Sequence, residues 1–94
     1  SNGVHKIKMT LAEEVTFFNK GAILKELDLL PRNSSLELDV TKTRYLDNDI
    51  IEILEDFSEK AKRKQIDIKL VSVRGVVKNP ESFIQFFQLR PQIV

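Results

Sequence analysis

The side chains best suited to chemistry lie together in one short segment, Asp47-Asn48-Asp49, just before a long amphipathic stretch. Two carboxylates this close can hold a metal ion or act as a general acid and base. Asp and Asn are also the residues that most often cap a helix N-terminus, and capping explains the cluster without a ligand. A helix N-terminus is in turn a natural contact for an anion or a partner. We therefore treat this segment as a candidate regulatory or interaction site.

The other residue types that catalyse reactions or bind metals are scarce. His5 is the sole histidine, and the chain has no cysteine, which excludes disulfides, thiolate metal sites and a cysteine nucleophile. His5 shares one side of an expected strand with Ile7 and Met9, a position typical of a structural histidine. Three dispersed glycines cannot build a phosphate-binding loop. The sequence therefore predicts no enzyme, no catalytic residue, no metal site and no cofactor.

The charge balance indicates neither nucleic acid nor lipid as a partner. Fifteen Lys and Arg residues face fourteen Asp and Glu residues, for a net charge of +1. This balance gives no general field that would attract polyanions. The one basic run, Lys60 to Lys64, ends a predicted helix, where cations complement the helix dipole. No apolar run approaches the ~20 residues of a membrane span, so we expect no lipid insertion by this part of the chain.

The length of 94 residues is that of one domain. Ser1-Asn2-Gly3 is typical of the remnant of a cleaved expression tag, which leaves residues 4–94 as a single expected domain. Within it, period-two alternation and helical spacing predict seven elements. The strands are expected at 4–9, 14–18, 35–40 and 66–73, and the helices at 20–30, 48–64 and 80–88.

The order β-β-α-β-α-β-α predicts an α/β fold. The short link between the first two strands favours an antiparallel pair, and the strand–helix–strand units favour parallel pairing with right-handed crossovers. Alternation within the strands indicates that one face of the sheet is exposed. We therefore expect a mixed four-stranded sheet with helices mainly on one face. The clearest helix is 48–64, whose apolar residues recur at spacings of four, three and four: Ile50, Leu54, Phe57 and Ala61.

The last predicted helix carries three phenylalanines, Phe83, Phe86 and Phe87. They could pack against the sheet as part of the core. They could also cover a dimer interface or a contact with a membrane domain, as large exposed apolar patches often do. Both alternatives remain open at this point, and the three residues are a candidate interface.

The order of these motifs resembles the STAS domain over about Val4 to Val73. The segments that carry the resemblance are the end of a strand, a short loop into an amphipathic helix, and the start of the next strand: Leu38-Asp39-Val40, Tyr45-Leu46-Asp47 and Ile66-Asp67-Ile68. The family comprises bacterial anti-sigma-factor antagonists and the C-terminal cytoplasmic domains of SulP anion transporters. Residues 11–20 and 43–54 are more similar to the transporter branch.

One position separates the two branches. In the antagonists the loop before the helix is roughly Asp-Ser-Ser-Gly, and its second serine is the phosphorylation switch. Here Asp49 stands at that position and Ile50 replaces the glycine. The resemblance therefore implies a permanent negative charge where the other branch adds one by phosphorylation.

The resemblance implies a cytoplasmic regulatory or assembly domain of a SulP-type inorganic anion transporter for sulfate or bicarbonate. Such a domain would act by protein–protein contact at the cytoplasmic face of the inner membrane, as part of a full-length integral membrane protein. Its partner would be its own membrane domain, and it could form a homodimer. The alternative is a free-standing partner-switch protein of the anti-sigma-factor-antagonist type.

Overall fold

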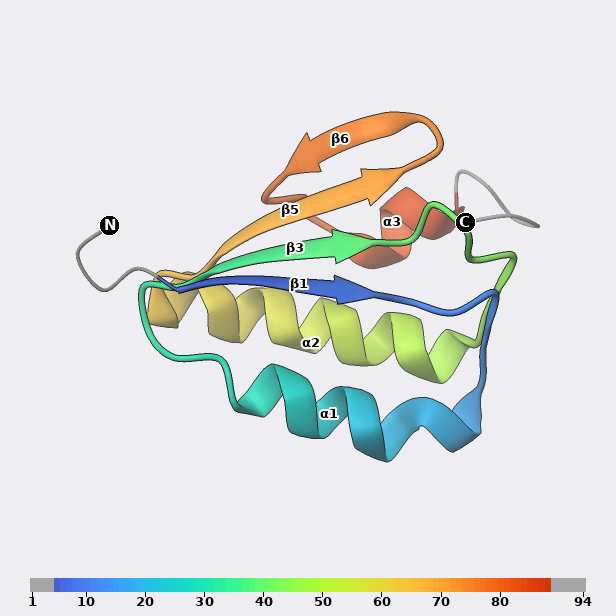
Figure 1. Ribbon diagram of the computed structural model, residues 1–94, viewed down its shortest axis with the longest axis horizontal. Helices are drawn as coiled ribbons and strands as arrows, with labels where there is room; N and C mark the ends of the chain where they lie inside the picture. The colour runs from blue at the N-terminus through green and yellow to red at the C-terminus, as the bar shows by residue number, and fades with distance from the viewer. Residues whose placement is uncertain (1–4, 89–94) are drawn as a thin grey trace.

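A computed structural model describes residues 5–88. Along the chain it has six strands, one short 3-10 helix and three α-helices (Figure 1). The strands are β1 (Lys6–Thr10), β2 (Glu14–Val15), β3 (Ser35–Asp39), β4 (Tyr45–Leu46), β5 (Asp67–Ser72) and β6 (Gly75–Lys78). The helices are η1 (Phe17–Asn19), α1 (Lys20–Asp28), α2 (Asn48–Lys64) and α3 (Phe83–Gln88).

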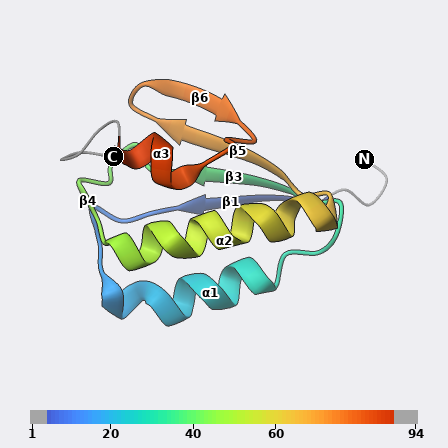
Figure 2. The ribbon, with the colours of Figure 1, turned by 180° about the vertical axis from the view of Figure 1, so that it is seen from behind.

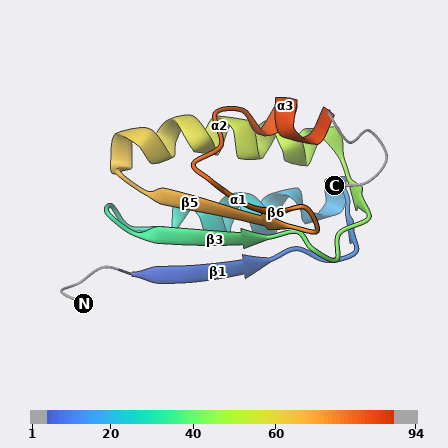
Figure 3. The same ribbon diagram turned by 90° about the horizontal axis from the view of Figure 1, so that it is seen from above.

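The main sheet has four strands in the order β1-β3-β5-β6. β1, β3 and β5 are parallel and β6 is antiparallel to β5, which confirms the expected mixed sheet. All three helices lie on one face of this sheet, the face turned toward the viewer in Figure 2 and seen from its edge in Figure 3. The other face is open and polar. On it, Lys8 of β1 and Lys69 of β5 flank Glu37 of β3, with N–O distances of 3.7 and 3.9 Å.

The helix α2 covers the centre of the sheet because its apolar residues form one continuous stripe. Its bounds match the predicted helix, and the residues of the predicted stripe are buried together with the side chains of the inner sheet face. Those with no exposed surface include Ile50 and Leu54 of α2 and Leu38 and Leu70 of the sheet. The core therefore lies between the helical layer and one face of the sheet.

The second predicted strand, 14–18, is wrong in length and in partner. The strand spans only Glu14–Val15, and it pairs in parallel with the unpredicted strand β4 in a separate two-stranded sheet. Residues 17–19 form η1 instead, because the Thr16 side chain accepts a hydrogen bond from the Phe18 amide while Asn19 accepts one from the Thr16 amide. This reciprocal capping starts a helix where apolar residues alone indicated a strand.

The fourth strand of the main sheet is β6, which was not expected. Gly75 begins this strand at a φ of 122°, which side-chain-bearing residues rarely adopt. This conformation lets the chain reverse after Val73-Arg74 and return along β5. A two-residue connection of this kind is typical of a β-hairpin.

The last helix begins at Phe83, three residues later than the Pro80 start that was predicted. Asn79 adopts a left-handed φ of 48° and extends the hairpin instead. Its amide donates to the Ile68 carbonyl at 2.7 Å, and its side-chain oxygen accepts from the Ile68 amide at 2.8 Å. Ser82 then caps the helix, since its hydroxyl oxygen accepts from the Gln85 amide at 3.0 Å.

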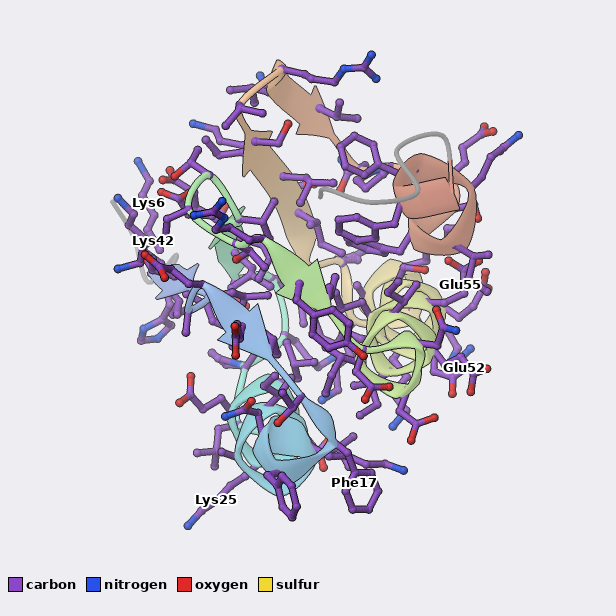
Figure 4. All side chains as sticks on the ribbon, turned by 90° about the vertical axis from the view of Figure 1, so that its right-hand side faces the viewer. Lys6, Phe17, Lys25, Lys42, Glu52 and Glu55 are labelled. Carbon is purple, nitrogen blue, oxygen red and sulfur yellow. The ribbon has the colours of Figure 1, made fainter. Side chains whose placement is uncertain are left out.

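A carboxylate of α2 holds the start of α3. Glu55 Oε1 accepts hydrogen bonds from the Phe83 and Ile84 amides at 2.6 and 3.1 Å. These two N–H groups belong to the first turn of α3 and have no partner inside that helix. In Figure 4, Glu55 lies on the side of α2 that faces α3, whereas Glu52 lies farther away. The contact fixes one six-residue helix to another element of the fold.

We expect Glu55→Ala to lower the free energy of unfolding by about 1–3 kcal/mol, because two amide donors of α3 lose a charged acceptor. Glu52→Ala on the same helix is the matched control and should change stability by less than about 0.5 kcal/mol. Urea unfolding followed by circular dichroism measures both. Equal effects of the two substitutions would contradict a capping role for Glu55.

Candidate functional site

The segment Asp47-Asn48-Asp49 lies at the N-terminus of α2, as the sequence indicated. Asp47 is the N-cap residue, and its side chain accepts a hydrogen bond from the Asp49 amide at 3.0 Å. Asn48 is exposed, and Asp47 and Asp49 are half-buried. Among residues 5–88 no three His, Cys, Asp or Glu side chains are grouped so that they could hold a metal ion. The Asp47 carboxylate thus satisfies the helix start.

The two-stranded sheet fixes the position of this helix start. The Asp47 amide donates to the Val15 carbonyl at 2.9 Å, and the Arg44 and Tyr45 amides donate to the Glu13 carbonyl at 2.6 and 3.0 Å. Thr43 adds a buried bond from its hydroxyl to the Leu11 carbonyl at 3.3 Å. These bonds hold the segment before α2 against the segment before η1.

Two aromatic side chains project into solvent from η1. Phe18 is 91% exposed and Phe17 is 54% exposed, and their rings meet edge to face with centroids 5.9 Å apart. Lys20 Nζ lies 5.5 Å from the centroid of Phe17, near its face. The reciprocal caps of Thr16 and Asn19 hold this turn. Figure 4 shows Phe17 directed away from the core.

A third exposed aromatic, Tyr45, is carried by β4 opposite Glu14 and is 52% exposed. We call the exposed residues Phe17, Phe18, Tyr45 and Asn48, with the half-buried Asp47 and Asp49, the α2 N-terminal surface. Sequence reasoning missed its aromatic part, because it placed residues 14–18 in a strand. The signal that could have found it is Thr16 followed three residues later by Asn19.

The loop between β3 and β4 starts at a charged turn. Asp39 accepts hydrogen bonds from the Thr41 hydroxyl at 2.7 Å and from the Thr41 amide at 2.9 Å. These two bonds, aided by the nearby positive charges of Lys8 and Lys42, hold the pKa of Asp39 below its ordinary value. A negative charge is therefore retained at the end of β3, one of the two inner strands of the main sheet.

The residues that carry hydroxyl groups around this loop differ in their exposure to solvent. Ser34 and Thr43 are buried, and Ser35 is half-buried in β3. Thr41 is exposed, but its hydroxyl donates to Asp39. Of these hydroxyls only that of Thr41 lies on an exposed residue, and it is engaged in the turn.

The candidate interface Phe83, Phe86 and Phe87 needs correction. Phe83 is 0% exposed and Phe87 is 3% exposed, and both belong to the core cluster. Phe86 is half-buried and packs against that cluster, with its ring edge to face with Phe87. The structure thus favours the core alternative, because α3 brings these rings onto the helical layer. They do not form an exposed patch.

The sole histidine, His5, lies exposed immediately before β1 rather than inside a strand. Its carbonyl accepts a hydrogen bond from the Ser35 amide at 2.7 Å, so its backbone supports the pairing of β1 with β3. In the part of the chain that the structure describes, no helix has the length and apolar character needed to cross a membrane.

We expect Thr41→Val to raise the pKa of Asp39 toward its ordinary value, because the hydroxyl donor is lost. The folded-state pKa lies below the unfolded one, so the bonds stabilise the fold above the unfolded pKa. That stabilisation is lost as the pH falls through the folded pKa. Carboxyl-carbon NMR titration measures the shift, and urea unfolding at neutral pH should show a small loss of stability.

Thr41→Ser retains the hydroxyl and is the matched control, so Asp39 should keep its low pKa in that variant. A titration of Asp39 that is the same in the wild type and in Thr41→Val would refute the role of the hydroxyl.

Neither the curated proteins nor the solved structures contain a match to this sequence. The family model of the STAS domain matches residues 2–91, nearly the whole chain. The one-faced mixed sheet with three helices agrees with this match. The chain therefore belongs to the STAS domain family.

Proposed function

We propose that this chain is the cytoplasmic regulatory or assembly domain of a SulP-type inorganic anion transporter for sulfate or bicarbonate. Membership of the STAS family indicates a regulatory or binding role, and STAS domains are generally non-catalytic. In the proposal the domain contacts its own membrane domain at the cytoplasmic face of the inner membrane. This contact couples the conformational state of one domain to that of the other. The contact surface is the α2 N-terminal surface.

The feature that supports the proposal is Asp49, which the resemblance places at the position of the family's phosphoserine. Asp49 is half-buried in the first turn of α2, and its amide is engaged by the Asp47 cap. A carboxylate near a helix N-terminus is favourably placed with respect to the helix dipole. The negative charge is therefore built into this helix start, which suits a constitutive contact better than a phosphorylation switch.

The exposed aromatic rings support the choice of surface. Burying a large aromatic side chain in a protein–protein contact removes much apolar area from water, and such residues often dominate interfaces. Phe18 is 91% exposed on a turn that is held by capping bonds at both ends. A preordered aromatic loses little conformational entropy on binding. Asn48, which is exposed at the start of α2, adds polar groups suited to the rim of such a contact.

The proposal predicts that switch kinases of the anti-sigma system leave the domain unmodified. Ser34 and Thr43 are buried, and the Thr41 hydroxyl is bound to Asp39. Incubation with such kinases and ATP, followed by mass spectrometry, should find no phosphate. Phosphate on Ser34, Ser35, Thr41 or Thr43 would instead favour the alternative, a free-standing partner-switch protein.

In the full-length protein we expect Phe18→Ser to lower anion transport by about fivefold or more, since loss of an interface aromatic costs more than about 1 kcal/mol. The fold should be unaffected because the ring is exposed. Uptake of labelled sulfate and bicarbonate into proteoliposomes measures the effect. Leu29→Ser, at the far end of α1 and 70% exposed, is the matched control and should transport normally.

Two results would contradict the proposal. One is a full-length gene that encodes no apolar segments of ~20 residues before this domain. The other is a Phe18→Ser protein that transports like the Leu29→Ser control.

A further inference from the structure

The strand β6 forms one edge of the main sheet, and all four of its residues are exposed. Figures 1 and 2 show that it lies beyond β5, away from α1 and α2. An exposed edge strand presents backbone groups that can pair with another extended segment.

The direction of those groups follows from the pairing of β6 with β5. The register joins Ser72 to Gly75 and Leu70 to Val77, and the Asn79 amide bonds the Ile68 carbonyl at 2.7 Å. Hydrogen-bonded and non-hydrogen-bonded pairs alternate in an antiparallel ladder. Gly75, Val77 and Asn79 therefore bond toward β5, while the N–H and C=O groups of Val76 and Lys78 point outward. Within residues 5–88 the order of the main sheet ends at β6, so no further strand pairs with these outward groups.

The side chains of this edge are apolar in the centre and basic at both ends. Val76 is 55% exposed on the open face and Val77 is 38% exposed on the other face. Arg74 precedes them and Lys78 follows, with Lys69 of β5 directly across from Lys78. The strand itself contains no acidic residue. Its charge therefore favours a partner with carboxylates.

The same charges disfavour pairing with a second copy of β6. A two-fold antiparallel pair must bring the outward residues 76 and 78 together in one of three registers. Pairing Val76 with Val76 sets Lys78 opposite Arg74, and pairing Lys78 with Lys78 sets two lysines opposite each other. The intermediate register, Val76 with Lys78, places Lys78 diagonal to both Lys78 and Arg74 of the other copy. Like charges at these positions are destabilising.

We propose that β6 is a docking edge for an extended acidic peptide segment of another protein, which adds to the sheet as an antiparallel strand. Two adjacent β-branched residues of the peptide pair with Val77 and Val76. Carboxylates before and after them lie beside Lys78 and Arg74. Main-chain bonds to the outward groups of Val76 and Lys78 supply affinity, and the charges supply selectivity. This surface is separate from the α2 N-terminal surface, so each can fail its test independently.

The probe for this edge is the synthetic peptide Ser-Glu-Val-Ile-Thr-Glu-Ser with blocked ends and a fluorophore. Fluorescence anisotropy with the domain should show binding that weakens as salt is added, because the flanking ion pairs are exposed. Val76→Pro removes one outward N–H without breaking a bond to β5, and it should weaken binding by about tenfold or more. Lys78→Glu should weaken binding by about as much, and replacing the first glutamate of the peptide, the one beside residue 78, by lysine should restore binding to that variant.

Lys25→Glu on α1 is the matched charge-reversal control, since Lys25 lies at the opposite end of the molecule from β6 (Figure 4). It should bind the peptide like the wild type. Circular dichroism and thermal unfolding should show that Val76→Pro and Lys78→Glu remain folded. The proposal is overturned if the peptide does not bind at millimolar concentration, or if both edge variants bind it as well as Lys25→Glu does. Sedimentation can also show a different occupant. If the wild-type domain is a dimer and the Val76→Pro variant is a monomer, β6 pairs with a second copy of the chain and not with an acidic peptide.

Discussion

The contact of α2 with the inner faces of β3 and β5 is the interaction on which the other parts of the domain depend. Leu38, Leu70, Ile50 and Leu54 are fully buried there, and removing one such side chain typically costs about 2–5 kcal/mol. Because only one face of the sheet is covered, every helix must pack on that side. The opposite face remains polar, and its charges pair across neighbouring strands. A single layer of helices thus accounts for both the core and the open surface.

Once α2 is held by this contact, its polar residues organise the segments at its ends and along its side. Asp47 caps the helix and joins its start to Val15 through the backbone. Glu55 lies beside the apolar stripe of α2, and its carboxylate accepts hydrogen bonds from the first turn of α3. At the other end, Gln65 ends the helix in a left-handed conformation with a φ of 58° and leads the chain into β5. The same helix therefore positions the candidate site and the last helix.

Much of this arrangement follows from local sequence patterns, and the remainder depends on contacts between distant residues. The bounds of α2 were predicted because a strong apolar period and cap residues agree there. The two-residue strands β2 and β4 carry too few residues to show alternation, and their pairing joins Glu14 to Tyr45 across the first helix and β3. The cap from Glu55 to Phe83 spans 28 residues and leaves no local signal. The acidic half of the candidate site was therefore predictable, whereas its aromatic half was not.

The two surfaces proposed for binding lie where turn chemistry overrides the hydrophobic pattern. Phe17 and Phe18 would continue a strand by composition, but the caps of Thr16 and Asn19 turn them outward. Val76 and Val77 would suit a covered strand, but the reversal at Gly75 places them on the sheet edge. In both cases hydrogen bonds within the domain keep apolar side chains exposed to water, which costs free energy. Contact with a partner at the two proposed surfaces would recover that free energy, which is why both proposals rest on places where the chain departs from its hydrophobic pattern.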